Sequence, residues 1–245
     1  MFDHVGIAVS DLAASERFYR TVLSALGSAP SHADAAMVGW DDWWIGATDP
    51  AHRVTRGLHV GFRAPDRAAV DAFWQAGIDA GQPADGAPGP RTAYGPDYYG
   101  GFLLDPDGNS VEAVHGSRER SVPDGSVDHL WVRVRDPQAT RQFYSTIAPY
   151  AGLRLTHDEP DHVRLSGADF SFSLVRDGRP LTEHVHLAFS ADENATVQAF
   201  HGAAIDAGYR DNGAPGERPV YHAGYYGAFV LDPDGHNIEV VNHHG

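Results

Sequence analysis

Hydrophobic residues along the chain follow two periods, which predict short strands alternating with helices. Residues 4–9 and 57–63 are compact segments of strand-forming residues, HVGIAV and GLHVGFR. After each of them, apolar residues recur three or four positions apart, which predicts helices over residues 12–26 and 65–80. The Pro- and Gly-rich stretch over residues 82–93 is expected to be a loop.

The stretch over residues 221–242, YHAGYYGAFVLDPDGHNIEVVN, predicts a strand, a tight turn and a second strand. Residues 227–231 are apolar, and the DPDG sequence at 232–235 has the proline and glycine of a tight turn. The strand then resumes over residues 238–241, where Glu239 stands between apolar neighbours. A carboxylate in such a place is costly unless it is paired or bound to a metal.

The same device occurs earlier, at residues 94–114, with Glu112 in the equivalent position. The likeness extends through much of each half, since residues 127–147 match residues 2–22. Self-similarity over nearly a whole half indicates a tandem duplication. A charged stretch at about residues 116–126 is the expected linker between the copies.

Each half again divides in two, and each quarter runs strand, helix, then further strands. Such units predict an α+β fold in which helices cover one side of curved sheets. The predicted domains are residues 1–116 and 127–245, with modules over 1–56, 57–116, 127–182 and 183–245.

Composition narrows the classes of partner. The chain has 245 residues, no cysteine and a formal charge of −15. The charge disfavours nucleic acids and anionic membranes, and the lack of cysteine excludes disulfides, a thiolate nucleophile and cysteine zinc sites. No secretory signal or membrane span is expected, so we predict a cytoplasmic protein that binds a small molecule as a monomer (a pseudo-dimer) or a homodimer.

Polar residues that both repeats keep on predicted strands point to metal binding. In each repeat there are two histidines and one glutamate, and two imidazoles with one carboxylate form the facial triad of a divalent-metal site with open coordination positions. Open positions suit catalysis rather than a structural role. The candidate ligands are His4, His59, Glu112, His129, His186 and Glu239.

The sequence leaves the grouping of these ligands open. The triads form within each repeat, or across the repeats with His4 joining His186 and Glu239. His184 rivals His186 because the two lie on the same face of a strand. Six further histidines lack partners in the other repeat and are interpreted as surface residues: His157, His162, His201, His236, His243 and His244.

The motifs DHVGIAVSDLAASERFY, GLHVGF and GFLLDPDGNSVEAV, with their second copies, resemble the vicinal oxygen chelate superfamily. That group includes glyoxalase I, bleomycin- and fosfomycin-resistance proteins and extradiol dioxygenases. The resemblance covers nearly all of both repeats, and it implies paired βαβββ modules that form cup-shaped half-barrels around a metal. The six candidate ligands fall on the ligand positions of the family. Fe(II) is the first expectation for the metal, and Mn, Ni, Zn or Co would also suit these ligands.

Two subfamilies fit less well than the superfamily. Glyoxalase I has a second carboxylate ligand, and the corresponding strands near residues 43–48 and 170–175 contain neither Glu nor Asp. The extradiol signature has a histidine that His222 matches, but its tyrosine position is Phe229 here. The first repeat has Gly95 in place of His222, so the second repeat is the better candidate active site, with His222 as the catalytic proton carrier.

Tyrosines ahead of each DPDG turn are candidates for substrate binding. Their alternative role is packing, as for the tryptophans near residue 43. The function that fits best is a metal-dependent enzyme with dioxygenase-like or lyase-like chemistry on a small oxygen-bearing substrate. The alternative is a non-catalytic protein that sequesters an aromatic natural product, as bleomycin-resistance proteins do. The candidate tyrosines are Tyr94, Tyr98, Tyr99, Tyr221, Tyr225 and Tyr226.

Overall fold

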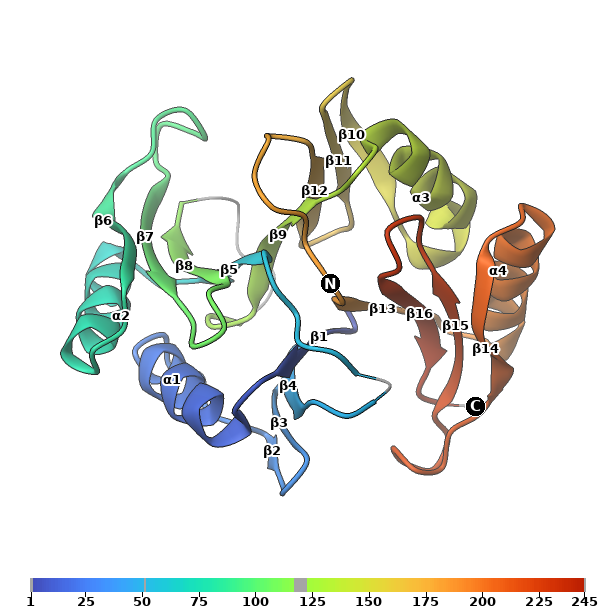
Figure 1. The fold of residues 1–245 in the computed structure, drawn as a ribbon, viewed down its shortest axis with the longest axis horizontal. Helices are drawn as coiled ribbons and strands as arrows, with labels where there is room; N and C mark the ends of the chain where they lie inside the picture. Colours follow the sequence, from blue (N-terminus) through green and yellow to red (C-terminus); the bar gives the residue numbers. More distant parts are fainter. Residues whose placement is uncertain (1, 51, 117–122, 245) are drawn as a thin grey trace. The chain divides into compact units, whose positions relative to one another are not determined.

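The chain folds as four strand–helix–three-strand modules. The computed structural model describes residues 2–50, 52–116 and 123–244. The order of elements, one strand, one helix and three strands, occurs four times along the chain (Figure 1). The predicted α+β class and its βαβββ modules are therefore confirmed. The helices of this described part are α1 (Leu12–Ser24), α2 (Arg67–Asp79), α3 (Pro137–Ala151) and α4 (Asn194–Asp206). In none of them is the apolar stretch long enough to cross a membrane.

The described chain divides into two compact units that differ from the two sequence repeats. We call residues 6–131 the N-terminal unit, and residues 2–5 together with 132–244 the C-terminal unit. Strand β1 (His4–Val9) starts in the C-terminal unit and ends in the N-terminal unit, and β9 (Val127–Arg133) does the reverse. The start of each repeat thus belongs to the unit formed mainly by the other repeat. Part of the expected linker, residues 117–122, lies outside the described residues.

In the N-terminal unit, strands pair in the order β9-β5-β8-β7-β6. The central strands β5 and β8 are parallel, and the other pairs are antiparallel. A separate antiparallel run joins β2, β3 and β4. The bounds are β2 His32–Ala33, β3 Met37–Trp40, β4 Trp43–Ala47, β5 His59–Arg63, β6 Ala84–Pro90, β7 Tyr99–Leu104 and β8 Ser110–His115.

The C-terminal unit repeats this plan, with strands in the order β13-β16-β15-β14 and a parallel pair at β13 and β16. Strands β10, β11 and β12 form an antiparallel run. The first residues of the chain run beside β13, where the Asp3 amide donates to the Ala188 carbonyl at 3.0 Å. The bounds are β10 Arg154–Glu159, β11 His162–Ser166, β12 Ser171–Val175, β13 His186–Ser190, β14 Arg210–Glu217, β15 Tyr226–Leu231 and β16 Asn237–Asn242.

The loop predicted over residues 82–93 is wrong for most of its length. Strand β6 occupies Ala84–Pro90 and pairs with β7, with shifts of register on either side of Gly86. β14 pairs with β15 in the same irregular way. Proline and glycine are tolerated because each strand ends the strand order of its unit and is interrupted by bulges.

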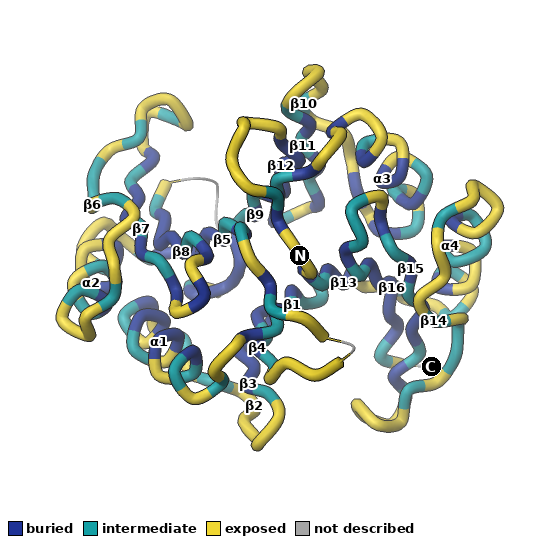
Figure 2. The backbone as a smooth tube through the Cα atoms, in the orientation of Figure 1, coloured by how far each residue is buried: buried dark blue, intermediate teal, exposed yellow. Residues whose placement is uncertain are grey.

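The DPDG turns are built as the sequence predicts, and they direct a buried strand in each unit. The Asp105 carboxylate accepts hydrogen bonds from the amides of Asp107 and Asn109, and Asp232 does the same for its own turn. Gly108 takes a φ of +84°, which a side chain resists. The following strands β8 and β16 are largely buried (Figure 2).

Aromatic side chains fill the core of each unit. In the N-terminal unit, Trp43 is fully buried and meets Phe62 edge-on at 5.3 Å and Tyr19 at 5.4 Å. Two of the three clustered tryptophans, Trp40 and Trp43, are therefore core residues. One histidine was misassigned as a surface residue: His236 is only 1% exposed.

Candidate functional site

Each unit brings two histidines and one glutamate together on neighbouring strands. His4, His186 and Glu239 lie within ligand distance of one another in the C-terminal unit, and we call them the His4 triad. The other three candidates form the His59 triad in the N-terminal unit: His59, Glu112 and His129. The parallel pairing of β13 with β16, and of β5 with β8, sets the histidine beside the glutamate strand. Of the two groupings that the sequence leaves open, the structure has the one across the repeats.

The ligand atoms converge as they would around one ion. In the His4 triad, His186 Nε2 lies 3.0 Å from His4 Nε2 and 3.1 Å from Glu239 Oε2, and the third separation is 3.6 Å. Ligands held about 2.1 Å from a metal stand about 3.0 Å apart at right angles and about 3.4 Å apart in a tetrahedron. The observed separations therefore fit a divalent ion bound by three atoms.

The His59 triad is more regular. His59 Nε2 lies 3.2 Å from both Glu112 Oε2 and His129 Nε2, and the third separation is 3.3 Å. The glutamate is fully buried, and each imidazole is about one-sixth exposed. Burial works against charge at Glu112, but hydrogen bonds from His129 and His59 outweigh it and lower the pKa of the carboxyl. These three side chains therefore favour a charged carboxylate that faces two imidazoles.

A carboxylate next in sequence orients one histidine of each triad. Asp3 Oδ1 lies 2.8 Å from His4 Nδ1, and Asp128 Oδ2 lies 2.9 Å from His129 Nδ1. A carboxylate at Nδ1 fixes the tautomer that turns the Nε2 lone pair toward a metal. Burial opposes the charge on His129, but its bonds to Asp128 and Glu112 raise its pKa to about 9. A proton and a metal ion therefore compete for this ring.

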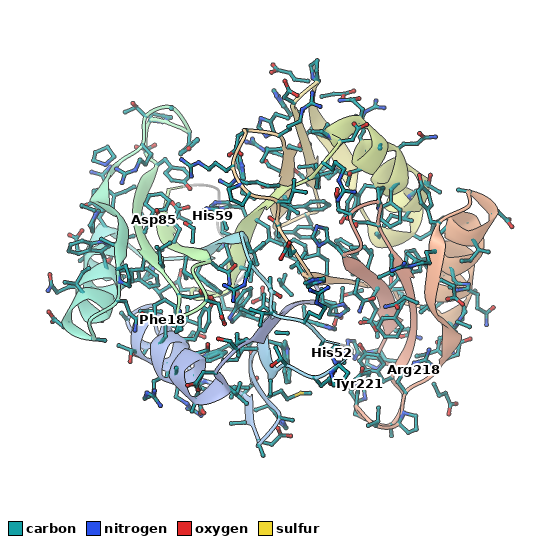
Figure 3. All side chains as sticks on the ribbon, viewed as in Figure 1. Phe18, His52, His59, Asp85, Arg218 and Tyr221 are labelled. Carbon is teal, nitrogen blue, oxygen red and sulfur yellow. The ribbon has the colours of Figure 1, made fainter. Side chains whose placement is uncertain are left out.

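The other histidine of each triad is supported differently in the two units. His59 Nδ1 lies 3.0 Å from the Ser110 hydroxyl, which donates to Asp85 at 2.7 Å (Figure 3). His186 Nδ1 lies 3.2 Å from the Asn237 carbonyl and within reach of its side-chain amide. Asn212 in turn donates to the Asn237 side chain at 2.9 Å. An anionic support in one unit is thus replaced by a neutral one in the other.

A buried tyrosine holds each glutamate. The Tyr225 hydroxyl donates to Glu239 Oε1 at 2.7 Å, and the Tyr98 hydroxyl donates to Glu112 Oε1 at 2.9 Å. Burial, followed by the nearby carboxylate charge, raises the pKa of both phenols well above the ordinary value, so both stay protonated. The free oxygen, Oε2, is the one that faces the histidines. An added Cβ at Gly227 would lie 2.6 Å from Glu239 Oε1, so glycine leaves the room for this carboxylate.

The second tyrosine of each pair points to the opposite face of the sheet. Tyr99 donates to Asp71 on α2 at 2.8 Å, and Gln198 on α4 donates to the Tyr226 hydroxyl at 3.0 Å. Successive strand residues face opposite sides, so this follows from the position of Tyr98 and Tyr225 at the triads. The structure therefore does not bring Tyr99 or Tyr226 to either triad.

His222 stands at the end of a hydrogen-bonded series that leads to His4. Its Nε2 lies 2.9 Å from His243 Nδ1, and His243 Nε2 lies 2.8 Å from Asp3 Oδ2. The ring of His222 also lies against Tyr225, with centroids 5.3 Å apart. Tyr221 is 55% exposed beside the same Tyr225 ring, and Tyr94 takes the matching place at Tyr98. His184, the rival of His186, has a φ of +56° and is not part of the triad.

Three functional candidates were missed in the sequence. Asp3 and Asp128 carry a signal that could have found them, because an aspartate directly precedes the first triad histidine of each repeat. His243 carries no such signal, since the equivalent residue of the first repeat is Gly116. Its role depends on the end of β16 passing close to Asp3, which sequence spacing does not reveal.

Known proteins resemble this chain in sequence and in fold. The sequence model described as Glyoxalase/Bleomycin resistance protein/Dioxygenase superfamily matches residues 1–113 and 126–240. Glyoxalase I of Saccharomyces cerevisiae is 29% identical over 177 residues, which is 58% of this chain and 52% of the yeast protein. This chain thus spans about half the length of that curated relative.

Two solved structures share the fold over nearly the whole chain. A glyoxalase I mutant from Zea mays superposes with a TM-score of 0.72 at 18% identity, covering 99% of this chain and 92% of the maize chain. A putative dioxygenase from Bacillus subtilis gives 0.66 at 15% identity, covering 98% and 84%. At these identities the likeness is one of fold.

Proposed function

This chain belongs to the Glyoxalase/Bleomycin resistance protein/Dioxygenase superfamily, and from that premise we propose that it is a divalent-metal-dependent enzyme. The substrate is a small molecule with two adjacent oxygens, and the reaction is of the dioxygenase or lyase type. The observation that carries the proposal is the convergence of two imidazole nitrogens and one carboxylate oxygen in each unit.

The residues fit a metal better than they fit a structural role. Each carboxylate oxygen that faces the histidines belongs to a glutamate at most 1% exposed. Burying a charge of this kind is costly unless a cation or hydrogen bonds compensate it. Both histidines of each triad have a partner at Nδ1, which leaves Nε2 for a ligand. We therefore assign His4, His186 and Glu239 as one set of ligands and His59, Glu112 and His129 as the other.

A divalent ion in such a site would polarise substrate oxygens and stabilise the anion that forms on them. The chain itself supplies orientation. Tyr225 holds Oε1 of Glu239, so that Oε2 faces the ion, and Asp3 keeps His4 in the ligating tautomer. His222 and its partner His243 can exchange a proton with solvent near this triad. Fe(II) remains the first choice of metal, with Mn, Ni, Zn and Co as alternatives.

Metal analysis of protein purified without chelators tests the ligand assignment. We expect two equivalents of divalent metal in the unaltered protein and one in each of Glu112→Ala and Glu239→Ala. Asp79→Ala, which alters an exposed carboxylate at the end of α2, is the matched control and should keep both. Unchanged metal content in both glutamate variants would refute the assignment.

Oxygen uptake with Fe(II)-loaded protein and a panel of catechols then addresses the reaction type. Uptake that is lost in Glu239→Ala supports dioxygenase chemistry. Tight binding of the catechols without oxygen uptake would instead indicate a protein that sequesters its ligand.

A further inference from the structure

In both units an arginine lies against a phenylalanine that neighbours one triad histidine, and no step of the proposed function uses this arginine. The guanidinium carbon of Arg218 lies 5.6 Å from the centre of the Phe229 ring, and that ring lies 6.2 Å from the ring of His186. In the N-terminal unit, Arg91 lies 5.1 Å from the Phe102 ring, which is 5.9 Å from His59. The series from arginine through phenylalanine to ligand histidine is therefore duplicated.

The phenylalanines lie on the face of the sheet that carries the triads. Phe229 is paired directly with Glu239 between β15 and β16, and Phe102 is paired with Glu112 between β7 and β8. Residues directly opposite on paired antiparallel strands project from the same face. The arginine that covers each ring is therefore on the triad face and not on the helix face.

The backbone is shaped to let each guanidinium lie there. An added Cβ at Gly216 would lie 2.9 Å from Arg218 Nη1, and one at Gly89 would lie 3.1 Å from Arg91 Nη1. Both glycines belong to the irregular strands β14 and β6. The same motif, GAPG followed two positions later by arginine, occurs in both repeats. In each unit the same glycine-containing stretch thus forms an irregular strand and leaves room for the guanidinium.

The guanidinium groups keep donors that the chain does not use. Arg218 donates to the carbonyls of Ala214 at 2.7 Å and Glu217 at 3.1 Å, and Arg91 donates to the equivalent carbonyls of Ala87 and Pro90. An arginine has five N–H donors in a planar fork that matches a carboxylate. Within the described chain, no carboxylate pairs with either arginine, although the protein carries a formal charge of −15.

We propose that Arg218, and Arg91 in the other unit, bind a carboxylate of the substrate. The substrate class is then a small planar molecule with two adjacent oxygens at one end and a carboxylate at the other. Its body lies along the edge of Phe229, whose ring stands between His186 and the guanidinium. Tyr221 stands at the same edge, since its amide donates to the Arg218 carbonyl at 3.0 Å (Figure 3). This assignment rests on the proposed function, because the adjacent oxygens need the metal.

A matched pair of probes separates the two ideas. We would measure Kd for 3,4-dihydroxybenzoate and its methyl ester by calorimetry on the Zn(II)-loaded protein under nitrogen. Both probes offer the vicinal oxygens, but only the acid offers a carboxylate. The proposal predicts that the acid binds about tenfold more tightly than the ester in the unaltered protein, as expected for a charge-assisted fork. Arg91→Gln/Arg218→Gln should reduce this ratio to about one and leave the Kd of the ester within about twofold.

Arg210→Gln is the control, since Arg210 is an exposed arginine at the start of β14 and lies outside the proposed site. It should keep the ratio of the unaltered protein. Each single variant, Arg91→Gln or Arg218→Gln, should lose the preference at one site only. If the double glutamine variant does not fold, Arg91→Lys/Arg218→Lys takes its place. This variant retains the charge without the planar fork, and it should give an intermediate ratio of the two Kd values.

An unchanged ratio in the double glutamine or lysine variant would overturn the proposal. Equal weakening of acid and ester would also overturn it, because it would assign the arginines to holding the strand alone. If neither probe binds the Zn(II)-loaded protein better than the metal-free protein, the proposed function itself fails. That outcome is distinguishable because it is already visible without any arginine variant.

Discussion

The two triads have the same residue types but different surroundings. Asp128, which orients His129 of the His59 triad, faces the guanidinium of Arg63 at 3.3 Å, and both side chains are buried. Asp3, which orients His4 of the His4 triad, instead accepts a hydrogen bond from Ser190 at 3.0 Å and contacts His243 at 2.8 Å. The guanidinium beside one aspartate is thus replaced in the other unit by a hydroxyl and an imidazole. The two repeats thus share the triad residues and differ in the residues around them.

This difference also affects how each triad is connected to solvent. In the N-terminal unit, Arg63 lies against Asp128, and Asp85 accepts a hydrogen bond from Ser110 behind His59. In the C-terminal unit, His243 and the exposed His222 connect Asp3 to solvent through a series of hydrogen bonds. In the N-terminal unit the equivalent positions are Gly116 and Gly95, so that connection is absent from this described site. Substituting the diverged positions should therefore have unequal effects in the two units.

The largest expected effect is on stability, at the aspartates beside the ligand histidines. Asp128→Asn keeps a hydrogen-bond acceptor for His129 but removes a carboxylate that faces buried Arg63, and it should lower the free energy of unfolding by about 3 kcal/mol. Asp3→Asn faces no such cation within its unit and should cost only about 1 kcal/mol. Urea unfolding of the metal-free variants measures both.

Metal titration of the same variants sharpens this prediction. Each should lower metal affinity at its own triad by about tenfold, because each loses a charged partner at Nδ1 of one ligand.

In the unfolding experiment, equal stability losses for Asp3→Asn and Asp128→Asn would show that the pair of Asp128 with Arg63 adds little to the stability of the N-terminal unit.

The next effect concerns pH and the turns that precede β8 and β16. Burial lowers the pKa of His236 to about 4, whereas the equivalent residue of the first repeat is Asn109, which does not titrate. Both side chains accept from a backbone amide, His236 from Val185 at 3.4 Å and Asn109 from Leu58 at 3.1 Å. The pKa in the fold lies below the unfolded value of about 6.5. The contribution of His236 to stability is therefore complete above about pH 6.5 and is lost as the pH falls toward 4.

His236→Asn should remove this dependence. Relative to the variant, the unaltered protein should lose about 3 kcal/mol between pH 6.5 and pH 4, measured by urea unfolding at several pH values. Asp232, whose pKa burial raises to about 7, contributes the opposite pH dependence, so both proteins carry Asp232→Asn in this comparison. Asn109→His is the reciprocal test and should introduce the loss into the N-terminal unit. A pH-independent difference between the paired proteins would contradict the assignment.

The fold could be predicted because the duplication displays each pattern twice. The DPDG turns, the helices and the order of elements depend on local spacing, which the repeat confirms internally. The identities of the clustered side chains were also visible as polar residues on apolar strands. Their grouping was not, because β1 and β9 each start in the unit formed mainly by the other repeat, and local patterns do not encode which strands meet.

Other errors have the same origin. The sequence predicts a loop where strand β6 forms, because prolines and glycines are rare in strands. They are tolerated in β6 because it is an irregular strand at the edge of the strand order and pairs with β7. His236 was mistaken for a surface residue because a histidine does not reveal its burial. His243 had no repeat partner, so its contact with Asp3 had no counterpart from which it could be inferred.

The smallest expected effect distinguishes two equivalent helices. Asp66 caps α2 by accepting from the Ala69 amide at 2.8 Å, whereas Glu193 at the start of α4 makes no such side-chain bond. The longer glutamate side chain cannot take the compact capping geometry that aspartate uses. Glu193→Asp should therefore raise the free energy of unfolding by about 0.5–1 kcal/mol, and Asp66→Glu should lower it by a similar amount. Urea midpoints at constant m-value measure both. A gain at α4 without a loss at α2 would mean that packing, and not the cap, sets the stability of α2, and the two helices would then differ in more than their first residue.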